Sequence, residues 1–237
     1  MLLVERALVS SREKAQALLL AGQVRVEGQL ATKPGIQLGR DATIDIVGDT
    51  LRYVGRGGLK LEGALEDFQL SPQGKTCLDI GSSTGGFTDC LLQNDAATAY
   101  AVDVTIAQLD WKLRQDPRVV LVERNARYLT LADIPDSPAF ITVDVSFISV
   151  SKILPAVAGI AAPAADCLIL IKPQFELEKR KIGKGGIVRD PALHDEAIRR
   201  VTEAARQCGF EVIAVRPSRL PGAKGNLEFF LHARKHE

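Results

Sequence analysis

The sequence has few residues of the kinds that build disulfide frameworks, zinc sites or membrane spans. Its four cysteines are scattered without a C-x-x-C pair, and no histidine lies near them at ligand spacing. The most apolar window, residues 153–171, is interrupted by two prolines and Asp166, whereas a membrane helix needs about 20 nearly uncharged residues. The first residues lack the pattern of a signal peptide. We therefore expect a soluble cytoplasmic protein without a metal.

An excess of charge of either sign is also missing. The chain has 30 basic and 29 acidic residues, a formal net charge of +1, so any polyanion would have to be met by local basic patches. At 237 residues, with 46% apolar and 25% charged residues, the chain fits one ordinary domain plus a small appendage.

The first 60 residues carry a modest basic excess, with nine basic and six acidic residues. Two short helical patterns end at Gly22, and alternating apolar residues then predict small strands near residues 24–30 and 42–47. A solvated helix face would explain the charges, and so would a face that binds nucleic acid. In the second case the candidate RNA-binding residues are Arg6, Arg12, Lys14, Arg25 and Lys33.

Strand and helix patterns alternate from residue 75 to the end, after a Gly-rich linker at residues 49–58. The alternation predicts an α/β fold with a parallel sheet and helices on both faces. The strands are expected at residues 76–80, 99–104, 119–122, 139–145, 167–171, 212–215 and 227–232. Helices are expected at residues 87–93, 106–113, 150–160 and 195–207.

A glycine-rich turn between the first of these strands and the next helix is typical of nucleotide-binding folds. Residues 77–93 read CLDIGSSTGGFTDCLLQ. A dinucleotide fingerprint would have glycine at the positions of Gly81, Ser83 and Gly86, and the serine removes the middle one. No Gly-Lys-Ser/Thr closes the turn, which excludes a P-loop. S-adenosylmethionine, a cofactor without phosphates, fits what remains.

The expected contacts of this cofactor come from the turn and from the ends of the next strands. Asp79 would meet the ammonium end directly or through water, Asp103 the ribose hydroxyls, and Asn125 the adenine. A packed turn without a ligand is the alternative. The predicted cofactor-binding residues are Asp79, Gly81, Ser82, Ser83, Gly85, Gly86, Phe87, Asp103, Asn125 and Asp144.

Four charged residues occur where apolar elements should be buried. Asp144 and Lys172 end the fourth and fifth strands, Glu228 lies within the last, and Lys60 lies on the helix after the linker. Carboxyl ends of parallel strands meet over the ligand crevice, so Asp144 and Lys172 should pair there. A structural ion pair is the alternative.

A loop with five basic residues and three glycines, residues 179–189, follows the fifth strand. We expect it to be mobile and to grip RNA phosphates, although a solvated surface loop has the same composition. The RNA-binding candidates outside the first segment are Arg56 in the linker and, in this loop, Lys181, Lys184 and Arg189.

Two family resemblances follow from these motifs. SSREKAQALLLAGQVRVEGQLATKPG resembles the S4 RNA-binding domain, although the basic residues that usually precede its first helix are absent. The motifs YVGRGGLKL, LDIGSSTGGFTDCLLQ, VDVSFIS, LIKPQFE, GKGGIVRDP and GNLEFFLH resemble the TlyA/hemolysin A family, which joins an S4 domain to an FtsJ-like 2′-O-ribose methyltransferase. The implied domains are an S4 domain at 1–48, the linker at 49–58 and the methyltransferase at 59–237.

The resemblance implies methyl transfer to a ribose of ribosomal RNA by the tetrad Lys60, Asp144, Lys172 and Glu228. Lys172 would be the general base, Asp144 would orient it, and Lys60 with Glu228 would fix the ribose. The sequence after strand four also lacks the Asp/Asn-Pro-Pro-aromatic pattern of amino-directed enzymes. Two other readings remain: a non-catalytic protein that binds RNA or the ribosome, and, from the hemolysin name alone, a membrane-lytic protein.

Overall fold

The computed structural model describes residues 2–6, 8–9, 11–20, 24–31, 35–36, 38–39, 41–46 and 52–237. The chain divides into two compact units, Met1–Arg52 and Tyr53–Glu237. The division lies within the predicted linker, and residues 47–51 are outside the described part. Residues 53–58 of that linker belong to the second unit, where Tyr53 packs in a core with Leu61 and Phe87. The predicted domain bounds at 48 and 59 stay predictions.

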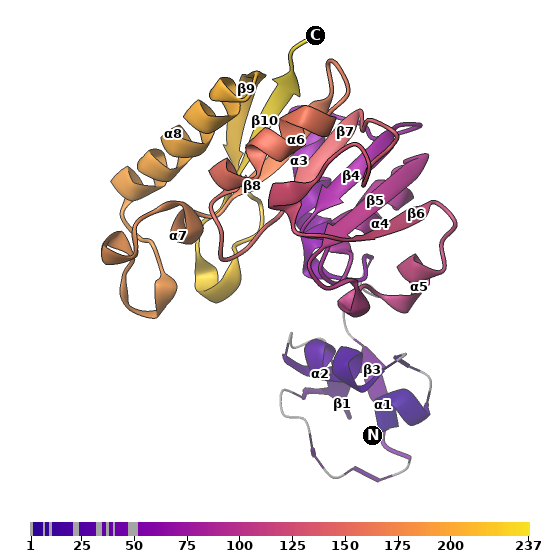
Figure 1. Cartoon of the computed structure of the whole chain (residues 1–237). Coiled ribbons are helices and arrows are strands. Elements are labelled where there is room, and N and C mark those ends of the chain that lie inside the picture. Colours follow the sequence, from indigo (N-terminus) through magenta and orange to yellow (C-terminus); the bar gives the residue numbers. More distant parts are fainter. Residues whose placement is uncertain are drawn as a thin grey trace. The chain divides into compact units, whose positions relative to one another are not determined.

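The first unit is a small α+β fold (Figure 1). It consists of α1 (Leu2–Glu5), α2 (Arg12–Leu20), β1 (Val24–Val26), β2 (Gln29–Leu30) and β3 (Ile44–Ile46). The strands form an antiparallel sheet in the order β2-β1-β3. Glu27 and Gly28 join β1 to β2, and both have positive φ. A two-residue turn with these torsions matches the right-handed twist of the two strands that it connects.

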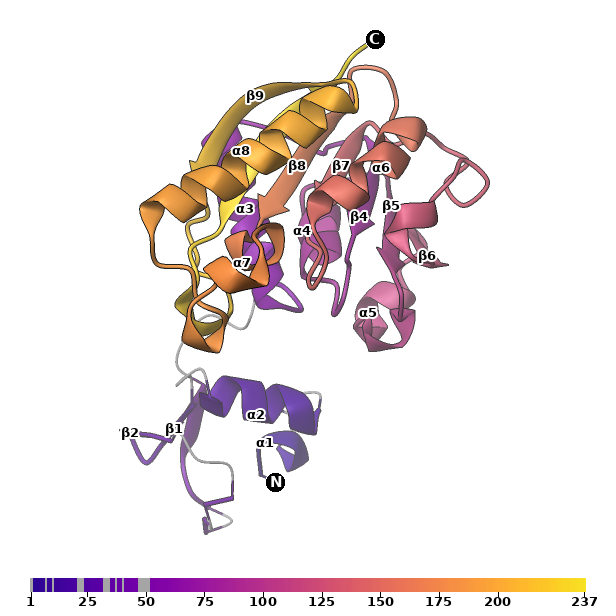
Figure 2. The same cartoon turned by 60° about the vertical axis from the view of Figure 1, so that its left-hand side comes forward.

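The second unit contains a seven-stranded sheet (Figures 1 and 2). Its strands are β4 (Thr76–Ile80), β5 (Thr98–Asp103), β6 (Val119–Glu123), β7 (Phe140–Val143), β8 (Asp166–Ile171), β9 (Phe210–Pro217) and β10 (Phe229–Lys235). Its α-helices are α3 (Arg56–Phe68), α4 (Gly86–Gln93), α5 (Trp111–Arg114), α6 (Leu154–Ile160), α7 (Pro173–Glu176) and α8 (Pro191–Gln207).

The sheet order is β6-β5-β4-β7-β8-β10-β9, and the strands from β6 to β8 are parallel. The expected α/β fold is therefore confirmed as a Rossmann-like sheet, with one difference from the expected parallel sheet: β10 runs antiparallel to both β8 and β9. Residues 218–228 connect β9 to β10 without a crossover helix, and a direct connection of this kind joins antiparallel neighbours. Glu228 lies just before β10, at the sheet edge where β8 ends.

Helices cover both faces of the sheet (Figure 2). On one face, α6 and α8 pack on Leu78, Ile141 and Ile169, whereas α3 and α4 pack on Cys77 and Leu168 on the other. The alternation of neighbouring residues between two cores shows that the strands are buried on both sides, as parallel sheets require. The sheet is therefore a rigid base for the loops at its edges.

The helices differ from the predicted ranges where side chains cap them. Residues 106–113 form a 3-10 turn, Ile106–Gln108, and then α5, whose N-cap Asp110 accepts a hydrogen bond from the Lys112 N–H at 3.0 Å. Residues 150–160 likewise divide into the 3-10 helix Val150–Lys152 and α6. Asp190 caps α8, which begins four residues before its predicted start.

Candidate active site

The turn after β4 is closed by direct contact with the loop after β7. Gly81 has φ +85°, and a Cβ there would lie 2.3 Å from the backbone oxygen of Asp144. The Asp144 N–H also donates to the Ile80 carbonyl at 2.8 Å. Only glycine fits this position, because both its torsion and its space exclude a side chain. The turn and the acidic loop thus form one surface.

The next residues of the turn present polar groups toward a small hollow. Ser82 is buried, and among the described residues no group hydrogen-bonds its Oγ. The Ser83 N–H donates to Asp103 Oδ2 at 2.9 Å. The hollow, about 130 Å³, is lined by Gly57, Gly81, Ser82, Ser83, Thr84, Gly86, Phe87 and Asp144. An orphaned buried hydroxyl in a glycine-walled hollow fits a polar ligand group.

The last two glycines of the turn serve packing. Gly85, at φ +98°, is the N-cap of α4, and a Cβ there would lie 2.2 Å from Leu113. A Cβ on Gly86 would lie 2.9 Å from the Gly58 backbone nitrogen. The N-terminus of α4 is therefore pressed against residues 55–58, and the Val54 N–H also bonds Asp89 on α4 at 2.8 Å.

A larger pocket of about 530 Å³ continues from the turn across the ends of β4, β5 and β7. It shares Gly81, Ser83 and Asp144 with the small hollow. Asp103 and Asn125 line it, so the structure places both predicted adenosine contacts at one pocket. The Asn125 Oδ1 accepts the Arg127 N–H at 3.1 Å, which fixes the orientation of its amide.

Asp79 takes a different place from the one that the sequence suggested. It is fully buried behind the turn and lines neither hollow. Its carboxyl accepts hydrogen bonds from Thr88 at 2.6 Å and from Thr142 at 3.0 Å. The side chain thus ties α4 and β7 to the turn, and its contact with the cofactor, direct or through water, stays a prediction.

Burial raises the pKa of Asp79 to about 7, which predicts a pH-dependent stability. The folded state keeps this proton up to about pH 7 while the unfolded state loses it near pH 4, so stability should fall as the pH rises between these values. We expect Asp79→Asn to remove on the order of 1–2 kcal/mol of this dependence between pH 5.5 and 7.5. Urea unfolding of both proteins at the two pH values measures it, and parallel curves would contradict the assignment.

The four charged residues form two ion pairs. Lys172 Nζ lies 2.5 Å from Asp144 Oδ1 and donates to Ser146 Oγ at 2.9 Å. Lys60 Nζ lies 2.5 Å from Glu228 Oε2, and the two side chains are 12% and 2% exposed. β10 pairs with β8 so that Phe229 faces Ile171, which puts Glu228 and Lys172 at the ends of neighbouring strands. All four residues therefore belong to one edge of the sheet.

The basic residues proposed for RNA contact have mixed environments. In the first unit Arg12 and Arg25 are exposed, and Arg6 donates to the Ala42 carbonyl at 2.7 Å. Lys33 and the side chain of Lys14 lie outside the described part. In the second unit Arg56 and Arg189 are exposed, Lys181 is paired with Glu196 at 2.6 Å, and the side chain of Lys184 is not described.

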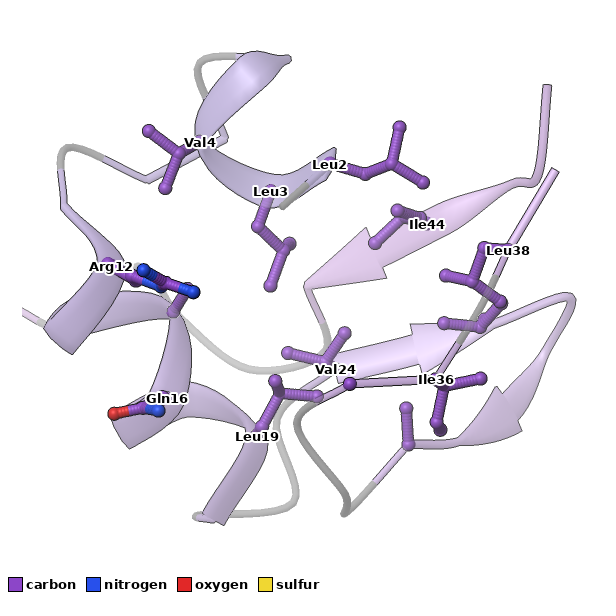
Figure 3. Close-up of a pocket in the computed structure, with 14 residues that line it drawn as sticks. Leu2, Leu3, Val4, Arg12, Gln16, Leu19, Val24, Ile36, Leu38 and Ile44 are labelled. Carbon is purple, nitrogen blue, oxygen red and sulfur yellow. The ribbon is translucent and has the colours of Figure 1, made fainter. Parts of the chain in front are cut away.

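The first unit has a hollow of its own, about 220 Å³, between its helices and sheet (Figure 3). Its lining is mainly apolar and includes Leu3, Ala15 and Val24 of the unit's core. Arg12 and Gln16 lie at one side (Figure 3). The described residues that line it include no carboxylate, histidine or cysteine.

Sequence reasoning assigned no role to two residues of the VDVSFIS motif, Ser146 and Phe147. Both line the larger pocket, and Ser146 holds the Lys172 ammonium. Phe147 is 91% exposed with φ +66°, and its ring lies 5.1 Å from that of Phe175. The signal in the sequence was an aromatic residue three positions after Asp144 at the strand end, but its exposure depends on a backbone torsion that the sequence does not show.

Asn226 fixes the glycine-rich basic loop, residues 179–189, to the segment just before Glu228. Asn226 Oδ1 accepts the Val188 N–H at 2.9 Å, and Nδ2 donates to the Gly186 carbonyl at 2.9 Å. Lys224 also donates to the Gly185 carbonyl at 2.9 Å. Residues 185–188 therefore lie beside the segment that leads into Glu228.

The protein has a Rossmann-like sheet whose glycine-rich turn and acidic strand end line a pocket, and two lysine–carboxylate pairs lie beside this pocket. This fold and this site are those of a methyltransferase. The sequence matches the FtsJ-like methyltransferase family over residues 53–235 and the S4 domain over residues 1–44. The chain therefore belongs to the FtsJ-like methyltransferase family and carries an S4 domain. The enzyme class and the cofactor predicted from the sequence, S-adenosylmethionine, are confirmed.

Individual proteins agree with this assignment. The 16S/23S rRNA (cytidine-2′-O)-methyltransferase TlyA of Mycobacterium tuberculosis is 45% identical over 234 residues, 98% of this chain and 87% of that protein. A solved structure of a hemolysin-like protein from Streptococcus thermophilus is 43% identical with a TM-score of 0.81, over 100% of this chain and 87% of that one. An S-adenosylmethionine-dependent methyltransferase from Methanosarcina mazei, 19% identical, shares the fold with a TM-score of 0.53 over 73% of this chain and 97% of its own.

Proposed function

We propose that this protein transfers a methyl group from S-adenosylmethionine to a ribose 2′-hydroxyl of ribosomal RNA. The observation that carries the proposal is the pair of lysine–carboxylate contacts, Lys172 with Asp144 and Lys60 with Glu228, at the edge where the cofactor pocket opens. Two cations and two carboxylates at one edge suit a weakly acidic hydroxyl that must lose a proton as it attacks. The similarity to TlyA supports the RNA substrate.

The residues at the pocket fit the cofactor. Asp103 can accept from ribose hydroxyls, Asn125 can meet the adenine, and the orphaned Ser82 hydroxyl in the small hollow can meet the amino-acid end. When bound, S-adenosylmethionine supplies an activated methyl group on a sulfonium. The pocket and the hollow share Gly81 and Asp144, so the reactive centre would lie between them, next to the Lys172 ammonium.

Each charged residue has a task that its contacts allow. The amine of Lys172 would accept the proton of the ribose hydroxyl as that oxygen bonds to the methyl group, and it would then release this proton to water. Asp144 and Ser146, both in contact with Lys172 Nζ, would direct the lysine toward that hydroxyl. Lys60 and Glu228 would hold the ribose in line for attack, and such positioning supplies much of the acceleration in group transfer.

Phe147 is proposed as the stacking surface for the target base. Its ring is exposed at the pocket, and stacking of a base on an aromatic ring is worth about 1–3 kcal/mol. We expect Phe147→Ala to raise the KM for RNA about tenfold or more while the cofactor Kd stays unchanged. Steady-state methylation with varied RNA measures it. Ile213→Ala, an exposed apolar residue of β9, is the control, and equal effects of both variants would contradict the role.

The S4 unit and the basic loop are proposed to bind the RNA backbone. Their exposed cations, among them Arg12, Arg25 and Arg189, can contact phosphates, which would make binding strongly dependent on salt. An rRNA substrate would place the protein in the cytoplasm, where ribosomes are found.

Two other functions remain distinguishable. A non-catalytic ribosome-binding protein would have no use for two lysine–carboxylate pairs beside the pocket. For the membrane-lytic reading, none of the helices in the described ranges is long and apolar enough to span a bilayer.

One experiment separates these functions. The protein is incubated with cofactor carrying a labelled methyl group and with each ribosomal subunit, and modified nucleotides are then mapped. We expect label on a ribose 2′-oxygen. Label on a base, or no label with RNA binding retained, would overturn the proposal.

A further inference from the structure

Glu176 is a buried carboxylate beside the site to which the mechanism above gives no role. It is the last residue of α7, which begins directly after Lys172, and only 6% of its surface is exposed. Burial raises the pKa of its carboxyl, and hydrogen bonds from neighbouring donors are what stabilise the ionised carboxylate in this buried position.

Its donors all come from one loop. Ser149 Oγ donates to Glu176 Oε2 at 2.5 Å, and the Val150 N–H donates to Oε1 at 2.9 Å. From the other side, Arg200 of α8 donates to the Glu176 backbone carbonyl at 3.2 Å. Glu176 is therefore held to α8 by its backbone and holds the loop of residues 144–150 by its side chain.

The loop and the segment 172–176 are joined along their whole lengths. At one end Lys172 contacts Asp144 and Ser146, in the middle the Phe175 ring meets that of Phe147, and at the other end Glu176 holds residues 149 and 150. The contacts of Lys172 must change during the reaction, because this lysine exchanges a proton. The contact of Glu176 need not change, so it can keep the loop in place.

Phe147 shows why a second anchor is needed. Its φ of +66° is unfavourable for a bulky residue, and its ring is 91% exposed, so little packing holds it there. Strained torsions persist only where surrounding contacts determine them. Ser146 is held on one side by Lys172, and Ser149 on the other by Glu176.

We propose that Glu176 is a positioning residue that anchors residues 144–150 to α7 and so holds Ser146 and Phe147 where the target nucleotide binds. Its effect on catalysis rests on the proposed function, whereas the anchoring itself can be tested without any activity.

The anchoring is tested by hydrogen exchange of the loop amides in Glu176→Ala, Glu176→Gln and the unaltered protein. We expect the Val150 amide to exchange at least tenfold faster in Glu176→Ala. Glu176→Gln should restore most of the protection, because its amide can still accept from Val150 and donate to Ser149. Glu203→Ala is the control, since this exposed carboxylate of α8 accepts from Gln207 at 2.9 Å. Unchanged exchange in Glu176→Ala would overturn the proposal.

The catalytic consequence is tested by a double-mutant cycle on methyl transfer. Glu176→Ala should raise the KM for RNA about tenfold, with the cofactor Kd within about twofold, and Glu176→Gln should recover most of the loss. Added to Phe147→Ala, it should cause little further loss, because both changes remove the same presented ring. Multiplying effects would mean that Glu176 does not act through Phe147. If the unaltered protein transfers no methyl group, the proposed function fails, and the exchange experiment still decides the anchoring.

Discussion

Lys172→Met is expected to abolish measurable methyl transfer while the protein still binds its cofactor. The side chain keeps its length but loses the amine that would take the ribose proton, and general-base catalysis contributes about 10²–10⁴-fold. The loss should reach the upper part of that range, because Asp144 and Ser146 lose the group that they orient. Single-turnover transfer at saturating cofactor and RNA isolates this step from binding.

The control for this variant is Lys152→Met, which removes an exposed lysine from the 3-10 helix at the end of the same loop. It should keep full activity. If Lys172→Met retained more than about a tenth of the rate with normal cofactor affinity, Lys172 would not be the base. Lys60 would then be the remaining lysine of the site to examine in the same assay.

Gly81→Ala should weaken cofactor binding at least a hundredfold. The added Cβ would meet the Asp144 carbonyl oxygen at 2.3 Å, in a backbone region that costs a side chain about 1–3 kcal/mol. Both the turn and the acidic loop line the pocket, so whichever one yields, the pocket changes shape. Isothermal titration with S-adenosylmethionine gives the affinity directly.

Gly74→Ala separates the strain from the clash. Gly74 also has a positive φ, +69°, but a Cβ there meets nothing within 4 Å. It should cost some stability and leave cofactor affinity unchanged. Equal affinities for Gly81→Ala and the unaltered protein would show that the turn does not form the cofactor site.

The sequence predicted the site best where a residue of a particular chemical type lies at the end of a predicted strand or in the glycine-rich turn. Asp144 and Lys172 could be expected to meet because both end parallel strands, and the structure puts them 2.5 Å apart. Ser83 at the middle position of the turn excludes a dinucleotide on sequence alone. The order of strands and helices was equally readable, because the central strands β4, β5, β7 and β8 are buried on both faces and therefore form apolar runs in the sequence.

The structure was needed where a role depends on side-chain direction or backbone torsion. Asp79 has the sequence context of a ligand contact, yet its side chain turns inward to Thr88 and Thr142. Phe147 looks like a core residue in sequence and is exposed only because its φ is positive. The hydrogen bond between Ser149 and Glu176 joins residues 27 positions apart, and no local sequence pattern predicts such a contact.

The antiparallel last strand, β10, also affects the order in which the sheet can form during synthesis. In the sheet, β10 lies between β8 and β9, so β9 has no strand to pair with until β10 has been made. The Lys60–Glu228 contact closes over 168 positions of chain, and contacts of such long range form late in folding. A nascent chain would therefore have the glycine turn and the Asp144–Lys172 pair before it has a complete tetrad. If the four charged residues act as proposed, a chain that lacks β10 should have no Lys60–Glu228 pair and should transfer no methyl group.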